Sequence, residues 1–359
     1  MQRNRVVAAS LVAFCCVLVG ALLVAREAKD GRFKPLCRGA VQEETARLAI
    51  GGGGVETVSS DDSGSPRSDG LSVECEARAE DRSRHVTFSV GDSDFAPDVL
   101  DRTLHDNLFT GDISSPLGAE WPGTFTVESP GIAHATVVLK CSSGEHDYLL
   151  LNVKSLLSDA GTYFSRSKKE RLRLAQAAAS MSSEADRQWK CGAQLGKKIR
   201  QAPADPLRSH PEPLSEATGT CRSMRQLAPI AGKWGITQAI GTELAEKSTT
   251  QDCLLINDKG KRVYRLSALS GPLAQGYRSS SSVLGDVQGK AGREEKGGGW
   301  AWASAQCPQG EPTALFTAAS TRLGEEDRVK VSADFERAML KAFGSDMAAL
   351  HGCGKPALP

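Results

Sequence analysis

Cysteine is the residue type of this 359-residue chain whose number and spacing point to covalent chemistry. Outside an apolar stretch near the N-terminus there are eight cysteines, at Cys37, Cys75, Cys141, Cys191, Cys221, Cys253, Cys307 and Cys353. The first four are separated by 38, 66 and 50 positions and the last four by 32, 54 and 46, so the two sets run in parallel. In an oxidising compartment such cysteines form disulfides. Each set allows three pairings, and we favour the sequential ones, Cys37–Cys75, Cys141–Cys191, Cys221–Cys253 and Cys307–Cys353.

Metal binding is the alternative use of cysteine, and the spacing does not favour it. No C-x-x-C pair occurs, and we interpret His351, near Cys353, as a helix-end residue. Asp92, Asp94 and Asp98 offer oxygens of the kind that bind Ca²⁺, but their spacing fits no EF-hand loop, so an exposed acidic loop is favoured. We therefore predict neither a metal nor a cofactor.

Catalytic motifs are also lacking. The chain has no G-x-S-x-G, H-E-x-x-H or Walker sequence. Ser165 and Lys168 fit the S-x-x-K spacing of penicillin-interacting acyl enzymes, but the companion motifs S-D-N and K-T-G are absent. A serine that caps the charged helix after it explains the same residues, so we predict no catalytic residue.

Histidines and tryptophans leave one alternative open. The histidines are scattered along the chain, at His85, His105, His134, His146, His210 and His351. Trp300 and Trp302 alternate on one predicted strand and therefore face the same side. Packing in the core is the default interpretation of this pair, and an aromatic pair that faces a ligand is the alternative.

Elements around the cysteines repeat in the same order. A helical pattern begins at Cys37 and ends near Gly51, and another begins at Cys221 and ends near Gly235. Strands are predicted at 55–58, 71–77, 85–90, 133–140 and 148–153, and again at 236–242, 253–257, 263–269, 300–306 and 313–319. We infer an α+β chain with two tandem copies of an antiparallel sheet packed with helices.

Each copy is predicted to close with a long helix. In the second copy the apolar face consists of Phe335, Met339, Phe343, Met347 and Leu350. In the first copy a thinner face consists of Leu172, Ala175, Ala179 and Trp189. The expected domains are residues 37–195 and 221–355, joined by a proline-rich extended linker at 196–220.

Residues 6–25 form an uninterrupted apolar run preceded by Arg3 and Arg5. Twenty helical residues span about 30 Å, the thickness of the hydrocarbon core of a bilayer. The arginines place a tail of residues 1–5 in the cytoplasm and the bulk outside, so we predict a single-pass protein of the cell membrane. A cleaved signal peptide is the alternative, but a cut after Ala25 would leave Leu23 at a position that prefers a small residue.

The segments CRGAVQEETARLAIGGGGVETV and CRSMRQLAPIAGKWGITQAI, each followed by a strand with a second cysteine, resemble domains of unknown function common in actinobacterial envelope lipoproteins. The resemblance covers the first third of each copy, and this chain has an apolar span in place of a lipobox. It implies a location in the cell envelope and no activity.

We therefore expect a membrane-anchored, extracytoplasmic binding or interaction module that meets an envelope protein or a small ligand. An envelope enzyme, hydrolase-like and with a site built from dispersed residues, is the alternative. The net charge of +1 argues against nucleic-acid binding.

Overall fold

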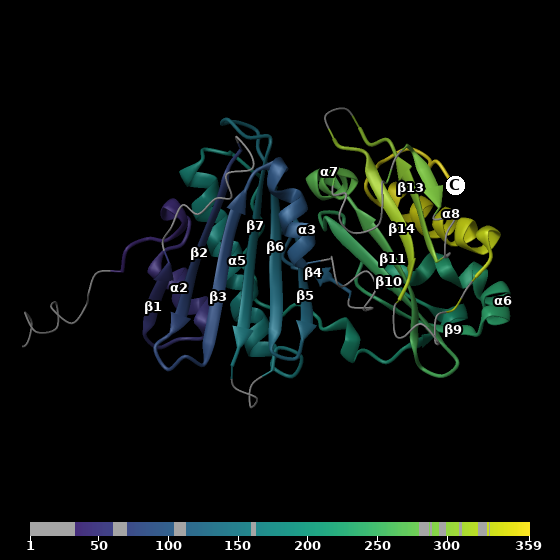
Figure 1. Cartoon of the computed structure of the whole chain (residues 1–359), viewed down its shortest axis with the longest axis horizontal. Helices are drawn as coiled ribbons and strands as arrows, with labels where there is room; N and C mark the ends of the chain where they lie inside the picture. Colours follow the sequence, from purple (N-terminus) through teal and green to yellow (C-terminus); the bar gives the residue numbers. More distant parts are fainter. Residues whose placement is uncertain are drawn as a thin grey trace, which may run out of the picture. The chain divides into compact units, whose positions relative to one another are not determined.

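A computed structural model describes residues 33–59, 70–103, 113–158, 163–279, 287, 289–293, 299–308, 311–321, 329 and 331–359 (Figure 1). Leu36–Pro359 form one compact unit. The predicted tail at 1–5 and membrane span at 6–25 lie outside the described residues. Among the helices that are described, none combines the length and the apolar character needed to cross a membrane.

The first sheet has seven antiparallel strands. In chain order they are β1 (Val55–Ser59), β2 (Ser72–Ala79), β3 (Arg84–Gly91), β4 (Ser115–Pro116), β5 (Gly123–Ser129), β6 (Ile132–Lys140) and β7 (Tyr148–Leu157), and in the sheet they lie in the order β1-β2-β3-β7-β6-β5-β4. Its helices are η1 (Cys37–Gly39), α2 (Glu43–Ile50), η2 (Ser93–Phe95), α3 (Ala96–Thr103) and α5 (Lys168–Gln188). We call this sheet with its helices the first repeat.

The second sheet also has seven antiparallel strands. They are β8 (Glu212–Pro213), β9 (Ile236–Gly241), β10 (Thr250–Asn257), β11 (Arg262–Leu269), β12 (Ala291–Arg293), β13 (Trp300–Ala305) and β14 (Ala314–Ser320), in the order β12-β13-β14-β11-β10-β9-β8. Its helices are η5 (Gly219–Leu227), α6 (Ala228–Ala231), η6 (Gly232–Trp234), α7 (Gly271–Ser279) and α8 (Ala333–Leu350). This sheet with its helices is the second repeat.

The two repeats share a strand order. Six strands of the second sheet, taken as β9-β10-β11-β14-β13-β12, correspond in chain order to β1-β2-β3-β7-β6-β5 of the first. The extra strand is beside β5 in the first sheet and beside β9 in the second. The predicted α+β class, with two antiparallel sheets in tandem, is confirmed, and every predicted strand overlaps an observed one.

Several elements were not predicted. No element was assigned to residues 91–131, which contain η2, α3, β4 and β5, and α7, β8 and β12 of the second repeat were not predicted either. In both repeats a helix follows the third strand, and each has proline at its second position, Pro97 in α3 and Pro272 in α7. Proline in a first helical turn is a start signal, because its missing N–H has no partner there in any case.

The segment 196–220 is only partly the free linker that its prolines predict. It has no regular structure up to Asp205, but three side chains of the first repeat bind its backbone. Trp121 donates to the Lys197 carbonyl (2.8 Å), Gln176 to that of Ile199 (2.9 Å) and Arg171 to that of Pro203 (2.8 Å). After η3 (Pro206–Arg208), the segment forms β8 and η4 (Leu214–Glu216), so its second half belongs to the second sheet.

The closing helices each cover one face of a sheet. In α8 the predicted face is correct for Phe335, Met339, Phe343 and Met347, which are buried, whereas Leu350 at the end of the helix is only half-buried. Each such side chain contributes about 1.5–3 kcal/mol when fully buried.

In α5 the predicted face is wrong. The buried residues include Leu174, Ala178, Met181 and Ala185, and of the predicted set only Ala175 is buried. Leu172 and Leu174 are two positions apart and alanines occupy both sides of this helix, so its apolar periodicity does not identify one face.

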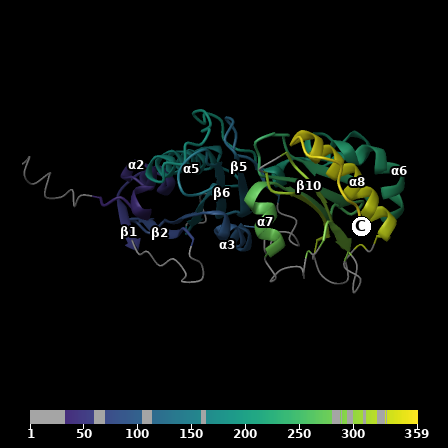
Figure 2. The same cartoon turned by 90° about the horizontal axis from the view of Figure 1, so that it is seen from above.

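The repeats also share a core. Helices α3 and α7 pack side by side (Figures 1 and 2), so closely that a Cβ on Gly276 would lie 2.6 Å from that of Ala96. The buried residues around them are Phe95, Ala96, Val99, Leu100, Val138, Tyr148 and Leu150 from the first repeat and Leu269, Leu273, Ala274, Tyr277, Val287, Trp300, Trp302, Leu315 and Ala319 from the second. This shared core is continuous between the repeats and holds them together.

Candidate functional site

The eight cysteines form four disulfides, each within one repeat. The pairs are Cys37–Cys75, Cys141–Cys191, Cys221–Cys253 and Cys307–Cys353, with S–S distances of 2.13, 2.00, 2.09 and 1.95 Å. These are the sequential pairs favoured by the sequence. Both members of the first and third pairs are buried, whereas Cys141, Cys307 and Cys353 are partly exposed.

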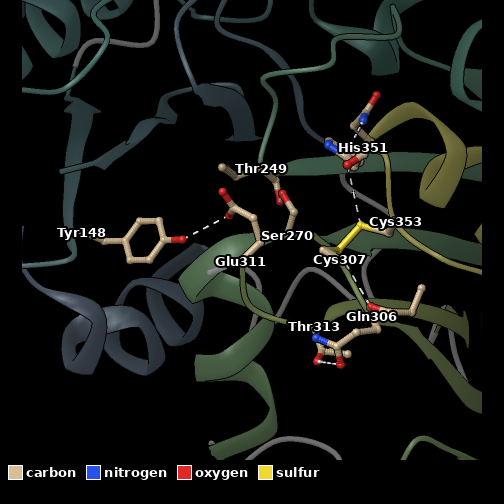
Figure 3. The surroundings of a disulfide bond; sticks show 11 residues. Tyr148, Thr249, Ser270, Gln306, Cys307, Glu311, Thr313, His351 and Cys353 are labelled. Carbon is tan, nitrogen blue, oxygen red and sulfur yellow. Dashed lines mark hydrogen bonds between the residues drawn. A yellow bond between two sulfur atoms is a disulfide. The ribbon is translucent and has the colours of Figure 1, made fainter. Parts of the chain in front are cut away.

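The exposed disulfides line one cavity. Segments of both repeats surround a groove of about 740 Å³, which we call the inter-repeat groove (Figure 3). Its walls include Ser142, Tyr148 and Gln194 from the first repeat and Glu246, Glu311 and His351 from the second.

Disulfides fix the walls of this groove. Cys141 follows β6 and is bonded to Cys191 after α5, and Cys307 follows β13 and is bonded to Cys353 after α8. Closing loops of 50 and 46 residues stabilises a fold by about 4 kcal/mol each in the chain-entropy model. The groove is therefore held in shape at equivalent places in the two repeats.

Glu311 connects the two walls. Its carboxylate forms an ion pair with Lys140 at the end of β6, and the Tyr148 hydroxyl donates to its Oε2 (3.2 Å; Figure 3). Burial, followed by the nearby Glu311 charge, raises the pKa of Tyr148, so this phenol stays protonated and acts as a donor. The side chains of Lys140 and Glu311 are 54% and 35% exposed, so their ion pair orients the groups more than it stabilises the fold.

His351 lies at the end of α8 and lines the groove. Its Nε2 is 2.9 Å from the amide nitrogen of Gln251, which can only donate, so Nε2 is the acceptor. Burial lowers the pKa of His351, an effect partly opposed by the charge and backbone of Glu246. The imidazole is therefore neutral at pH 7, with Nε2 bound to Gln251.

The tryptophan pair belongs to the shared core. Trp300 is 1% and Trp302 9% exposed, and their ring centroids are 5.9 Å apart. Tyr277 of α7 packs on Trp300, with 6.1 Å between the centroids of the two rings. Core packing, the default interpretation, is thus what the structure has, and the ligand-facing alternative is not supported.

The remaining sequence candidates have structural partners. Ser167, rather than Ser165, caps α5, because its hydroxyl accepts from the Glu170 N–H (3.3 Å). Asp92 accepts from the backbone of Leu71 (2.8 Å) and caps η2. Within the described part of the chain, no group of three His, Cys, Asp or Glu residues is arranged to hold a metal ion.

The histidines stay dispersed. His85 contacts Glu76 (3.2 Å), His134 contacts Glu128 (2.6 Å) and His146 lies 3.6 Å from Asp92. His210 is exposed, and His105 lies outside the described residues. His351 alone of the described histidines lines the inter-repeat groove.

The polar residues of the groove carry no motif. Glu246 and Glu311 lie in loops at the ends of strands, and nothing in their neighbourhoods distinguishes them from other exposed acids. The only sequence signal near the groove is the second cysteine pair of each repeat. Comparison of the chain with protein-family models, curated proteins and solved structures finds no match in any of the three.

Proposed function

We propose that this chain is a membrane-anchored, extracytoplasmic binding protein of the cell envelope, and that the inter-repeat groove holds its ligand or a segment of its partner. One observation carries the proposal: two disulfide-braced repeats with a common core enclose a cavity of about 740 Å³ between them. Binding sites for ligands are usually preformed concave surfaces of this size.

The character of the walls supports a binding role. Apolar side chains such as Val138 and four prolines are interspersed with hydroxyls, amides and charges of both signs. Such a lining combines apolar contact area with a few groups that orient the occupant. Because Lys140, Glu311 and Tyr148 already satisfy one another, an occupant meets an ordered wall at low entropic cost.

The anchor is part of the proposal. Residues 6–25 have the length and composition of a membrane span, and disulfides belong to oxidising compartments outside the cytoplasm.

An envelope hydrolase is the second candidate, because His351 and Glu246 both line the groove. Against it, Nε2 of His351 is already bound to Gln251, and neither ring nitrogen is hydrogen-bonded to a described serine or threonine hydroxyl. A general base needs a free ring nitrogen within reach of the proton that it takes.

Site-specific photo-crosslinking tests the groove. A benzophenone amino acid replaces Glu246 in the full chain, expressed in its own membrane, and the control carries it at Lys341, which is exposed on α8. We expect a discrete adduct from position 246 and none from position 341. Ser142→Trp on the opposite wall should abolish the adduct by filling the groove. An identical pattern at both positions, or an adduct that survives the tryptophan, would rule out the groove as the binding site.

Peptide mapping without reduction tests the location. The protein isolated from the membrane should yield the four intra-repeat disulfides and no free thiol among the eight cysteines. Reduced cysteines throughout would contradict an extracytoplasmic location.

A further inference from the structure

A second cavity lies within the second repeat and has a different electrostatic character. Its volume is about 540 Å³, and three cationic residues line it, Arg278, Lys290 and Lys355. The other described lining residues are neutral, and no carboxylate is among them. We call this cavity the basic pocket.

Arg278 is the only one of these three lining cations that is partly shielded from water. It lies near the end of α7, and its Nη1 donates to the carbonyl of Gly289 (3.0 Å). Its Nε and Nη2 are shielded from water and have no hydrogen-bond partner among the described residues. Burial lowers the pKa of Arg278, and no described carboxylate opposes that effect. Shielded guanidinium nitrogens that lack a partner are costly, and an anion bound at this place would satisfy them.

Hydrogen bonds to Ser304 fix the segments that carry the two lysines. The Ser304 hydroxyl of β13 donates to the Lys290 carbonyl (2.5 Å), and the Ala357 N–H donates to the Ser304 carbonyl (2.8 Å). Strand β13 thus connects the segment of Lys290 to the C-terminal segment that carries Lys355. Both lysines are exposed, and neither has an ion pair with a described acid.

We propose that the basic pocket binds a phosphate group carried on a larger molecule. Guanidinium and ammonium groups together supply the charge-assisted donors that phosphate oxygens accept. A volume of about 540 Å³ exceeds what one phosphate needs and lies in the range of small-molecule sites, so a phosphate ester or a phospholipid headgroup fits better than the free ion. This site is separate from the inter-repeat groove, although Pro312 contributes to both.

The first repeat lacks the same charges. Lys355 is two positions after Cys353, and the residue two positions after the equivalent Cys191 is Ala193. At the position of Arg278, the eighth residue of α7, α3 has Thr103. We therefore assign phosphate binding to the second repeat alone.

Titration calorimetry of the full chain in a neutral detergent tests the proposal, with glycerol 3-phosphate and inorganic phosphate as probes. We expect glycerol 3-phosphate to bind more tightly than inorganic phosphate, and more weakly as salt is added. Arg278→Gln should lower the affinity about tenfold, as should the double change Lys290→Gln with Lys355→Gln. Lys341→Gln removes an exposed lysine elsewhere and should have no effect.

A second arm distinguishes the source of the phosphate. Flotation with phosphatidylglycerol vesicles, against phosphatidylcholine vesicles, measures recognition of a lipid headgroup by the same variants. Vesicle binding that Arg278→Gln abolishes, without binding of glycerol 3-phosphate, would identify the headgroup as the source. No binding in either arm, or binding that the three basic-pocket substitutions leave unchanged, would overturn the proposal.

Further variants distinguish a loss of phosphate binding from a loss of folding and from a change in the inter-repeat groove. Arg278→Lys retains the charge and should retain most of the affinity, while the exposed lysine pair tests the site without disturbing α7. Glu311→Gln alters the inter-repeat groove and should leave phosphate binding unchanged, so failure of the basic pocket does not bear on the proposed function.

Discussion

Equivalent strands of the two repeats have different surroundings. In β2 of the first repeat, buried residues alternate with half-buried ones, whereas in β10 of the second every residue but the last is buried. Glu74 and Asp252 each precede the cysteine of their strand, and each accepts a hydrogen bond from a serine of the next strand, Ser89 at 3.2 Å and Ser267 at 2.6 Å. Only Asp252 is fully buried.

The difference comes from the first repeat itself. The segment that leads into β4 reaches the second sheet, where Ile113 packs on Ile240, Leu254 and Ile256. The backbone N–H of Ser114 donates to Asp252 Oδ2 (2.8 Å). Beneath this cover, Asp252 forms an ion pair with Arg265 in which neither side chain is exposed. One repeat therefore completes the core of the other.

Removal of the buried carboxylate should have the largest effect. Asp252→Ala leaves Arg265 buried without a counter-charge, and we expect it to lower the free energy of unfolding by about 3–5 kcal/mol. Glu74→Ala, the matched change in the first repeat, should cost less than about 1 kcal/mol because that side chain is half-buried. Urea denaturation of the full chain measures both. Equal losses would show that the two strands do not differ in the way that their burial indicates.

A smaller loss is expected where the repeats pack against each other. Gly276→Ala would press a methyl group against Ala96 of the neighbouring helix and should cost about 1–3 kcal/mol. Gly232, at the junction of α6 and η6, has open space around its Cβ position, so Gly232→Ala should be neutral or slightly stabilising. Thermal unfolding of the two variants compares them. A neutral Gly276→Ala would mean that α3 and α7 separate at little cost.

Acidification should produce the smallest and most gradual effect. Burial lowers the pKa of His134 in the first repeat, against the opposing effect of Glu128, and also that of His351 in the second. The unfolded chain, with histidine pKa values of about 6.5, then binds protons that the folded chain does not. The free energy of unfolding therefore has its full value above about pH 6.5. Below that pH it declines, by at most about 1.4 kcal/mol per pH unit for each histidine.

Urea denaturation at pH 7.5 and pH 5.5 measures this slope. His134→Gln and His351→Gln should each reduce it, and the first should have the greater effect because His134 is only 1% exposed. A stability that rises on acidification would contradict the inferred neutral state of both rings.

Local patterns in the sequence predicted much of the fold. The helix ends at Gly51 and Gly235 were predicted, and both glycines adopt the left-handed conformation of a helix C-terminus, with φ of 94° and 70°. The buried face of α8 follows from large apolar residues at helical spacing. In α5 the same method selected the wrong face, because alanines supply too little contrast between its sides.

Much less of the candidate site could be predicted from the sequence. Its polar residues lie in turns, where the sequence shows neither a periodic pattern nor a motif. Helices α3 and α7, which bring the repeats together, were marked only by Pro97 and Pro272. The expected linker also proved to be bound to α5 through its backbone, an interaction that its prolines do not indicate.

The sequence by itself determined the α+β elements of the two copies and which cysteines form disulfides, while three pairings remained open in each copy. Cysteine spacing, strand alternation and helical periodicity are properties of short segments, and they persist whatever surrounds them. Only the tertiary structure decided that the copies share a core, enclose a groove and bury the Asp252–Arg265 pair. Those features depend on contacts such as that between Ser114 and Asp252, which are 138 positions apart, and no local preference specifies which distant segment will exclude water from a strand.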